Sequence, residues 1–350
     1  MSDFTPGVWF GLPFEDYLAV PALSASGVKK FRASPMTFWA HSWMNPEHEV
    51  PMATPAMDFG TAFHKLILEG PGAFDAAYAI EPERDDHPDA LDGAKGLKER
   101  CEALGLKKSG TIAELCSRIR EVDQETELWP EILERFRSGA DGKRCLRPAD
   151  AARIQRMARM LAKHPSAKHV FMDGMPEVSI FWRDLETGTP MKARIDYLRQ
   201  REVVDLKTFS NSTDMPLQAA VTRAVAANLY HVQAAIYLEA VAQAKRMIRE
   251  DSVFGNAPGL PWLEGFVNAK EGRFFFVFVE TGEANNVVIR ELPREIEGVE
   301  TMTFAAGQRI FRAATEGFSN YIREYGHAPW VNHLPTSIIS DAEFPLWAQE

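Results

Sequence analysis

Two neighbouring apolar segments in the middle of the chain carry charged residues. In RIDYLRQREVVDLKTF, residues 194–209, Asp196 lies among apolar neighbours, and Asp205 and Lys207 flank Leu206. Side chains alternate along a strand, so a carboxylate and an amine two residues apart face the same way. Buried charge without a partner is costly. These residues therefore predict a shared polar pocket.

A third carboxylate belongs to the strand before them, PEVSIFWR, where Glu177 follows Pro176. In an antiparallel arrangement, Asp196 and Glu177 could reach the pocket of Asp205. Three acids repel one another unless a cation neutralises them, and oxygen-rich clusters suit Mg²⁺ or Mn²⁺. The alternative is an ordinary Asp205–Lys207 ion pair at a sheet edge.

The elements that must position these residues follow from periodicity and turn residues. A three-strand meander is expected over 175–209, and a hairpin over FFFVFVE and NNVVIREL. The order of helices and strands predicts an α/β core, with a central mixed sheet flanked by helices. The expected helices cover 57–70, two or three short segments in 94–138, 148–165, 216–250 and about 296–325.

Composition limits the class of protein. The 350 residues are 45% hydrophobic and 25% charged, as in ordinary globular chains. A net charge of −10 argues against a histone-like coat of nucleic acid, but it permits a nucleic-acid enzyme with local basic clusters. Three cysteines without CxxC spacing exclude a four-cysteine metal site within this chain. We expect a reduced, cytoplasmic chain without a secretory signal or a membrane span.

The motif set resembles the PD-(D/E)XK nuclease superfamily. PEVSIFW, RIDYL and VVDLKT are similar to its restriction-endonuclease-like core, GTAFHKLILEG to its G-x-x-x-H helix and VQAAIYLEA to its Q-x-x-x-Y helix. LSASGVKKFRASPMTFW and the final FPLWA resemble the RecE-like (exodeoxyribonuclease VIII) exonucleases. The resemblance implies one nuclease domain over 1–350, interrupted by a helical insertion at 82–145.

The resemblance also implies roles for single residues. His64, Asp196, Asp205 and the Leu206 carbonyl would bind metal, with Mg²⁺ (or Mn²⁺) as cofactor and two ions expected. Lys207 would orient or deprotonate the attacking water and stabilise the developing charge, and Glu177 would be a second metal or water ligand. Gln233 and Tyr237 would support the lysine and the substrate strand.

Three segments are candidates for DNA contact. AKGLKERCEALGLKKSGTIAELCSRI, residues 94–119, resembles a SAP motif with Lys107 and Lys108 in its turn; a helical hairpin used only for packing is the alternative. Arg153 and Arg156 lie on one face of the expected helix 148–165. The resemblance adds the first helix, and Arg194 could face the same groove. The candidates from the first helix are Ser26, Lys29 and Arg32.

The resemblance implies a magnesium-dependent exodeoxyribonuclease that degrades the 5′-ended strand of linear duplex DNA and leaves 3′ overhangs. It further implies a homo-oligomeric ring, a single-strand annealing protein as partner and a role in phage recombination. Two alternatives stay open: an endonuclease or single-strand-specific nuclease of the same fold, and a DNA-binding module with an idle site.

Overall fold

The computed structural model describes residues 4–49, 54–270, 272–331, 340 and 343. The FPLWA segment lies outside the described residues. The strands are β1 (Gly7–Phe10), β2 (Tyr78–Ile80), β3 (Arg144–Leu146), β4 (Met175–Arg183), β5 (Pro190–Leu198), β6 (Glu202–Phe209), β7 (Val253–Gly255), β8 (Arg273–Glu280), β9 (Val287–Glu291), β10 (Glu295–Ile296) and β11 (Val299–Glu300).

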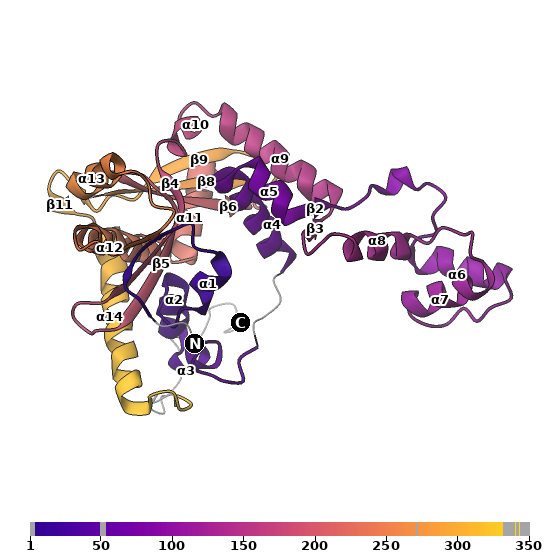
Figure 1. The fold of residues 1–350 in the computed structure, drawn as a ribbon, viewed down its shortest axis with the longest axis horizontal. Coiled ribbons are helices and arrows are strands. Elements are labelled where there is room, and N and C mark those ends of the chain that lie inside the picture. The colour runs from indigo at the N-terminus through magenta and orange to yellow at the C-terminus, as the bar shows by residue number, and fades with distance from the viewer. Residues whose placement is uncertain (1–3, 50–53, 271, 332–339, 341–342, 344–350) are drawn as a thin grey trace.

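Runs of helices lie between groups of these strands along the chain (Figure 1). A π-helical turn (Lys65–Glu69) and a 3₁₀ turn (Arg84–Asp86) complete the secondary structure. The helices are α1 (Phe14–Ala19), α2 (Ala25–Ala33), α3 (Pro35–Ala40), α4 (Pro55–His64), α5 (Pro71–Ala77), α6 (Gly93–Ala103), α7 (Ile112–Val122), α8 (Trp129–Ser138), α9 (Pro148–Lys163), α10 (Ala167–Val170), α11 (Leu217–Ala227), α12 (Tyr230–Arg249), α13 (Leu260–Asn268) and α14 (Met302–Tyr325).

A seven-stranded mixed sheet, in the order β7-β1-β4-β5-β6-β8-β9, forms the centre of the molecule. Strands β4, β5 and β6 are antiparallel neighbours, whereas β6 and β8 run parallel. The predicted meander and hairpin are therefore confirmed, and so is the α/β class. The expected strand set was incomplete, because the short strands β1 and β7 extend the sheet beyond β4.

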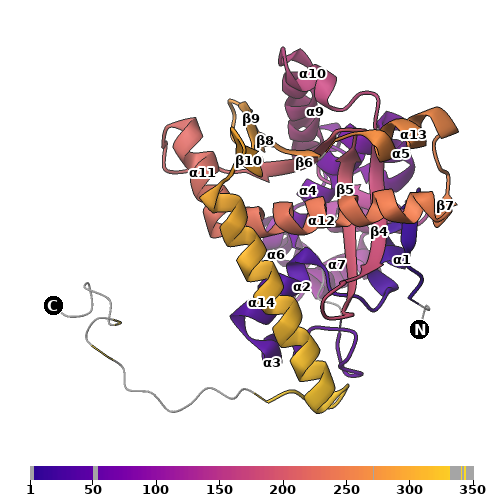
Figure 2. The same ribbon diagram turned by 90° about the vertical axis from the view of Figure 1, so that its left-hand side faces the viewer.

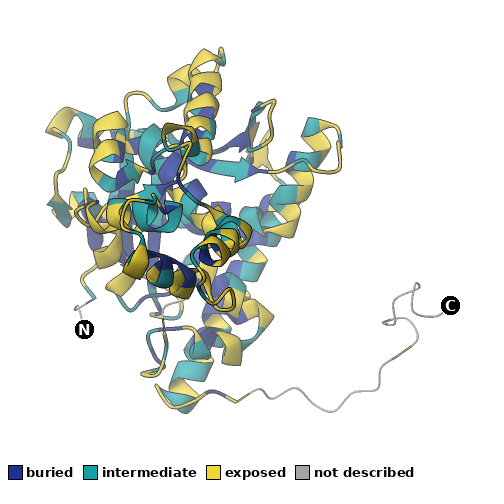
Figure 3. Cartoon of the chain, turned by 90° about the vertical axis from the view of Figure 1, so that its right-hand side faces the viewer, coloured by how far each residue is buried: buried dark blue, intermediate teal, exposed yellow. Residues whose placement is uncertain are grey.

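Apolar clusters cover both faces of the sheet. On one face, α2, α12, α13 and α14 pack over residues such as Val178, Ile195 and Phe276. On the other, α4, α5 and α9 pack over Val204 and Leu206. Figure 2 shows α12 crossing the strands and α14 packed across α12, and Figure 3 shows buried positions gathered along the strands and the helix faces that contact them. The site strands are thus enclosed from both sides.

Two helix predictions differ from the structure. The expected helix 216–250 is divided into α11 and α12, because Leu229 adopts a left-handed backbone with φ +51°. The expected helix 296–325 begins only at Met302, since Glu297 and Gly298, both with positive φ, form the turn of the β10–β11 hairpin. A residue with a left-handed backbone ends a right-handed helix. Of these three residues, only Gly298 is of a type that predicts such a backbone from the sequence.

The insertion is built around its own small core. Parallel pairing of β2 with β3 brings the two ends of this excursion together. Between them, α6 and α7 pack around Leu97, Cys101, Leu115, Cys116 and Ile119. Figure 1 shows these helices standing away from the sheet, with α8 leading back towards it.

Within the described ranges, none of the helices combines the length and apolarity needed to cross a bilayer.

Candidate active site

The site begins where β4 and β5 place two acids opposite each other. The register pairs Pro176 with Tyr197 and Val178 with Ile195, so Glu177 and Asp196 occupy the facing positions between them. Glu177 has φ +53°, a conformation that costs energy for a residue with a side chain. Like charges directly opposite each other also destabilise a sheet. Backbone strain at Glu177 and charge repulsion between Glu177 and Asp196 therefore occur at the same place in the sheet.

Strands β5 and β6 separate beside this point. Their ladder contains only two registered pairs, Tyr197 with Val204 and Leu198 with Val203, both close to the connecting turn. Beyond them, the Leu206 N–H donates to Asp196 Oδ2 at 2.8 Å, so a side chain takes the place of a ladder bond. We call this opening the β5–β6 fork. At the fork, the backbone pairing of an otherwise continuous sheet is interrupted.

Helix α4 brings His64 to the fork. His64 is the last residue of α4, and a π-helical turn follows it, a feature that often marks functional sites. Its Nδ1 lies 3.7 Å from Asp196 Oδ2. Burial lowers the pKa of His64 to about 4, and the nearby Lys207 ammonium adds to this effect. The imidazole is therefore neutral at pH 7, as a metal ligand must be.

Asp205 and Lys207 form a buried ion pair on β6. Lys207 Nζ lies 2.6 Å from Asp205 Oδ2, and Gln233 Nε2 on α12 donates to Asp205 Oδ1 at 2.7 Å. Burial raises the pKa of Asp205 to about 6, although Lys207 opposes the shift. Burial alone would lower the pKa of Lys207, but the Asp205 and Asp196 carboxylates outweigh it and raise that pKa. Lys207 is therefore an ammonium group at neutral pH.

The donor set fits a divalent cation. One ligand atom each from His64, Glu177 and Asp196 can lie within 4.8 Å of the other two. Among the described residues, Asp205 Oδ2 is buried and receives no hydrogen bond of good geometry, despite its ion pair. Burial raises the pKa values of Glu177 and Asp196, and the Asp196 charge raises that of Glu177 further. Carboxylates in such mutual repulsion are typical of a metal site.

Tyr237 lies behind the pair, on the same helix as Gln233. Burial raises the pKa of Tyr237 well above its ordinary value, and the Asp205 and Asp196 charges contribute. A side-chain hydrogen bond to Gln233 partly opposes this shift. Gln233 is thus placed to orient Asp205 from α12, and Tyr237 to support Gln233.

The predicted DNA-contacting residues lie in different surroundings. Arg194 is mostly buried and pairs with Glu177, while also donating to Ser179 Oγ at 2.9 Å. Arg153 donates to the Thr281 carbonyl at 2.6 Å and stacks on Phe59. These two guanidinium groups are therefore engaged within the chain, and their contact with DNA stays a prediction. Three candidates are exposed side chains on helices, namely Ser26, Arg32 and Arg156.

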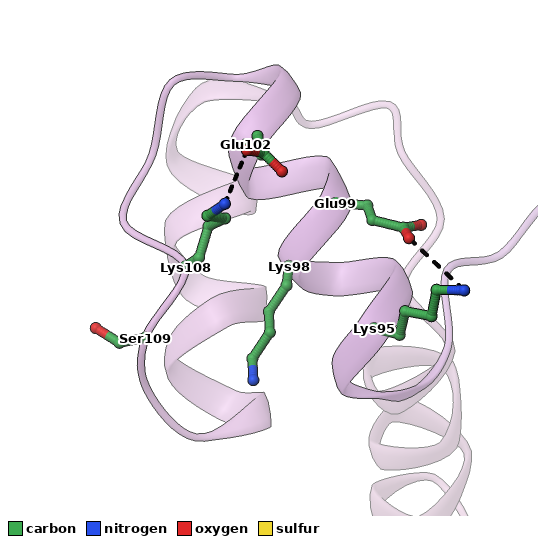
Figure 4. A pocket seen from close by; sticks show the side chains of 6 residues that line it. All are labelled: Lys95, Lys98, Glu99, Glu102, Lys108 and Ser109. Carbon is green, nitrogen blue, oxygen red and sulfur yellow. Dashed lines mark hydrogen bonds and ion pairs between the residues drawn. The ribbon is translucent and has the colours of Figure 1, made fainter.

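The SAP-like hairpin has two surface depressions of its own rather than a basic groove. One, of about 400 Å³, is lined by both lysines and glutamates together with Ser109, and Lys108 pairs with Glu102 at 2.8 Å (Figure 4). The other, of about 710 Å³, lies between α7 and α8. The Lys107 carbonyl accepts from Arg118 at 2.8 Å. DNA binding by Lys107 and Lys108 stays a prediction.

Three site residues were missed by the sequence reasoning. Tyr17 of α1 lies under Arg194, and Ser179 of β4 accepts from it. Tyr230 lies beside Lys207, with Nζ 5.2 Å from its ring centroid. The helical spacing of Tyr230, Gln233 and Tyr237 could have revealed the last one. Nothing in the local pattern marked Tyr17.

A mixed sheet with acids on adjacent strands, an Asp-x-Lys strand and a supporting glutamine defines a PD-(D/E)XK nuclease-like core. Residues 24–253 match the model of one family, described as "PDDEXK-like domain of unknown function (DUF3799)". The chain belongs to this family, and with it to the PD-(D/E)XK nuclease superfamily.

Among solved structures, the chain is similar to one from Eubacterium rectale that is described provisionally as an exonuclease. The two are 13% identical, with 88% of each chain covered and a TM-score of 0.41. Among curated proteins, none matches the chain. The family match is therefore the finding that assigns the chain.

Proposed function

We propose that this chain is a metal-dependent exodeoxyribonuclease that degrades the 5′-ended strand of linear duplex DNA and leaves 3′ overhangs. The observation that carries the proposal is the convergence of Glu177, Asp196 and His64 at the β5–β6 fork, next to the Asp205–Lys207 pair. The polarity and the preference for ends are supported by the motif resemblance alone.

The residues of the fork have different proposed roles. His64, Asp196 and Glu177 would hold the divalent ions, with Asp205 and the Leu206 carbonyl beside them. When bound, a pair of Mg²⁺ or Mn²⁺ ions supplies an activated water and neutralises phosphate charge. Lys207, kept protonated by the carboxylates, stabilises the negative charge that grows in the transition state.

End-labelled DNA tests the activity and its direction together. The protein is incubated with Mg²⁺ and linear duplexes labelled at either the 5′ or the 3′ end, and with a closed circle. The proposal predicts early release of the 5′ label, late release of the 3′ label and an intact circle. Cleavage of the circle would support an endonuclease instead, and preference for single strands would support the other alternative.

Substitutions connect that activity to the fork. Asp205→Asn and Lys207→Met should each reduce the rate at least about 10³-fold, because each removes charge from the reaction site. Glu202→Gln is the matched control, since Glu202 lies on the same strand but pairs with Arg199. If all three variants cleave DNA equally, the fork is not the active site, and the idle-module alternative gains support.

We also propose that the active form is a homo-oligomeric ring acting with a single-strand annealing protein in phage recombination, within the cytoplasm. These proposals rest on the RecE-like resemblance. Light scattering of the purified protein tests the ring directly, and a monomer at working concentration would contradict it.

A further inference from the structure

Tyr230 has an unusually well-defined position next to the fork. It is the first residue of α12 and follows Leu229, whose left-handed backbone ends one helix and starts the other. Its ring packs against Phe276 and Phe278 of β8, with centroid distances of 5.8 and 6.2 Å. A strained backbone on one side and two buried rings on the other fix the direction of this side chain.

Two ammonium groups lie over this ring. Lys29 Nζ of α2 is 4.9 Å from the Tyr230 centroid, and Lys207 Nζ of β6 is 5.2 Å from it. The two ammonium groups therefore lie no farther apart than the sum of these distances. An aromatic ring attracts cations through its quadrupole, most strongly where water is excluded. Tyr230 thus links the catalytic strand to α2, which is distant in sequence.

The charges on the two lysines are balanced differently. Lys207 pairs with Asp205. For Lys29, no carboxylate lies within ion-pair distance in residues 4–49, 54–270 and 272–331, although the side chain is half-buried. Burial and repulsion from Lys207 together lower the pKa of Lys29 to about 8, although the Asp205 charge opposes the shift. A half-buried ammonium beside another one is unfavourable unless an anion arrives.

We propose that Tyr230 is a positioning residue that holds Lys207 and Lys29 together, so that two ammonium groups face the charge developing on the cleaved phosphate. This inference rests on the proposed nuclease function and deepens it. The ring gives the Lys207 ammonium a second contact beside its pair with Asp205, and so restricts the direction of this side chain. Lys29 supplies the second positive charge, since the ion pair of Asp205 is with Lys207.

The test uses the full chain and single-turnover cleavage of a short duplex with saturating Mg²⁺. Tyr230→Leu removes the ring, and Tyr230→Phe keeps the ring while removing the hydroxyl. Lys29→Met removes the proposed second charge, and Lys30→Met is its matched control, because Lys30 is the exposed next residue of the same helix. Thermal unfolding of each variant shows whether the fold is intact, and fluorescence anisotropy gives DNA affinity separately from rate.

We expect Tyr230→Leu and Lys29→Met each to reduce the cleavage rate about 10-fold, in line with a desolvated cation–π contact, with a smaller change in DNA affinity. Tyr230→Phe should restore most of the rate lost in Tyr230→Leu. The double variant Tyr230→Leu/Lys29→Met should lose less than the product of the two single losses, because the two residues act together.

Three outcomes would overturn the inference. Tyr230→Phe could lose as much rate as Tyr230→Leu, which would assign the effect to the hydroxyl. Lys29→Met could behave like Lys30→Met. The rate losses could instead match losses of thermal stability, which would indicate a packing role alone. Failure of the nuclease function itself is distinguishable, because the unmodified chain would then show no magnesium-dependent cleavage, or Asp205→Asn would cleave DNA as fast as the unmodified chain does.

Discussion

Gln233 donates a 2.7 Å hydrogen bond to one oxygen of Asp205, the buried acid of the β6 strand. The other oxygen of this carboxylate lies 2.6 Å from Lys207 Nζ. The glutamine comes from α12, which crosses the sheet above the fork, so the helix fixes the orientation of Asp205 independently of any bound ion. Residues that hydrogen-bond to a metal ligand commonly contribute about 10–100-fold to metal affinity or activity. This factor corresponds to about 1–3 kcal/mol.

We therefore predict that Gln233→Leu reduces magnesium-dependent cleavage by about 10–100-fold while the protein stays folded. Gln243 provides the control, because it is an equally buried glutamine on the same helix, bonded to Glu239 at 3.0 Å rather than to the site. Cleavage rates and thermal unfolding of Gln233→Leu and Gln243→Leu are compared. Equal rates for the two variants would rule out orientation of Asp205 by Gln233.

Metal affinity should depend on pH in a defined direction. Burial raises the pKa of Asp205 to about 6 and also raises those of Glu177 and Asp196, so these groups hold protons at a higher pH than exposed acids. A divalent ion must displace those protons. Mn²⁺ affinity, measured by calorimetry, should therefore be at least about 10-fold weaker at pH 5.5 than at pH 7.5. An affinity equal at both pH values would contradict this assignment.

We predict that Lys192 stabilises the fold and has no part in the reaction. This buried lysine of β5 donates to the carbonyls of Tyr17, Leu18 and Val20 at 3.1, 2.9 and 2.7 Å, and so satisfies the end of α1. Lys192→Met should lower the free energy of unfolding by about 2–3 kcal/mol, because buried acceptors lose a charged donor. Urea unfolding measures this change. The exposed Lys95→Met should shift it by less than about 0.5 kcal/mol, and a similar shift in both variants would refute the capping role.

The insertion should be removable without loss of the nuclease fold. Its core around Leu97, Leu115 and Ile119 is separate from the two clusters on the sheet. Replacing residues 83–142 with roughly eight Gly/Ser residues would still span the β2–β3 ends. Glu81→Gln accompanies the change, because Arg137 of α8 pairs with the buried Glu81. We expect a cooperative thermal transition and preserved cleavage of short duplexes, and loss of either would show that the insertion is part of the core.

The strands that carry the site were readable from the sequence, because alternation and turn residues are local. Asp205 and Lys207 lie close together and form an ion pair, as expected for side chains that alternation places on one face of β6. His64 is different: only the family resemblance connected it to the acids, since contact between α4 and the sheet depends on tertiary packing. The same resemblance singled out Gln233, whose bond to Asp205 joins residues 28 positions apart.

Other features could not be read because they depend on backbone geometry without a local signal. The left-handed conformations of Glu177 and Leu229 occur at residues that rarely adopt them, so neither the backbone geometry of Glu177 opposite Asp196 nor the start of α12 was visible. Arg194 was assigned to DNA from its position two residues before Asp196. Its ion pair with Glu177 depends instead on the register between β4 and β5.

The residues of the β5–β6 fork contribute both to the stability of the sheet and to the proposed catalytic site. Beyond the pair Tyr197–Val204, the two strands are connected by the hydrogen bond from the Leu206 amide to the Asp196 side chain rather than by registered backbone pairs. A cation bound by Asp196 and its neighbours would add a further link between these strands. The same side chains would then both stabilise the sheet and bind the catalytic ion. We therefore expect substitutions of Asp196 to change both the cleavage rate and the rigidity of the sheet.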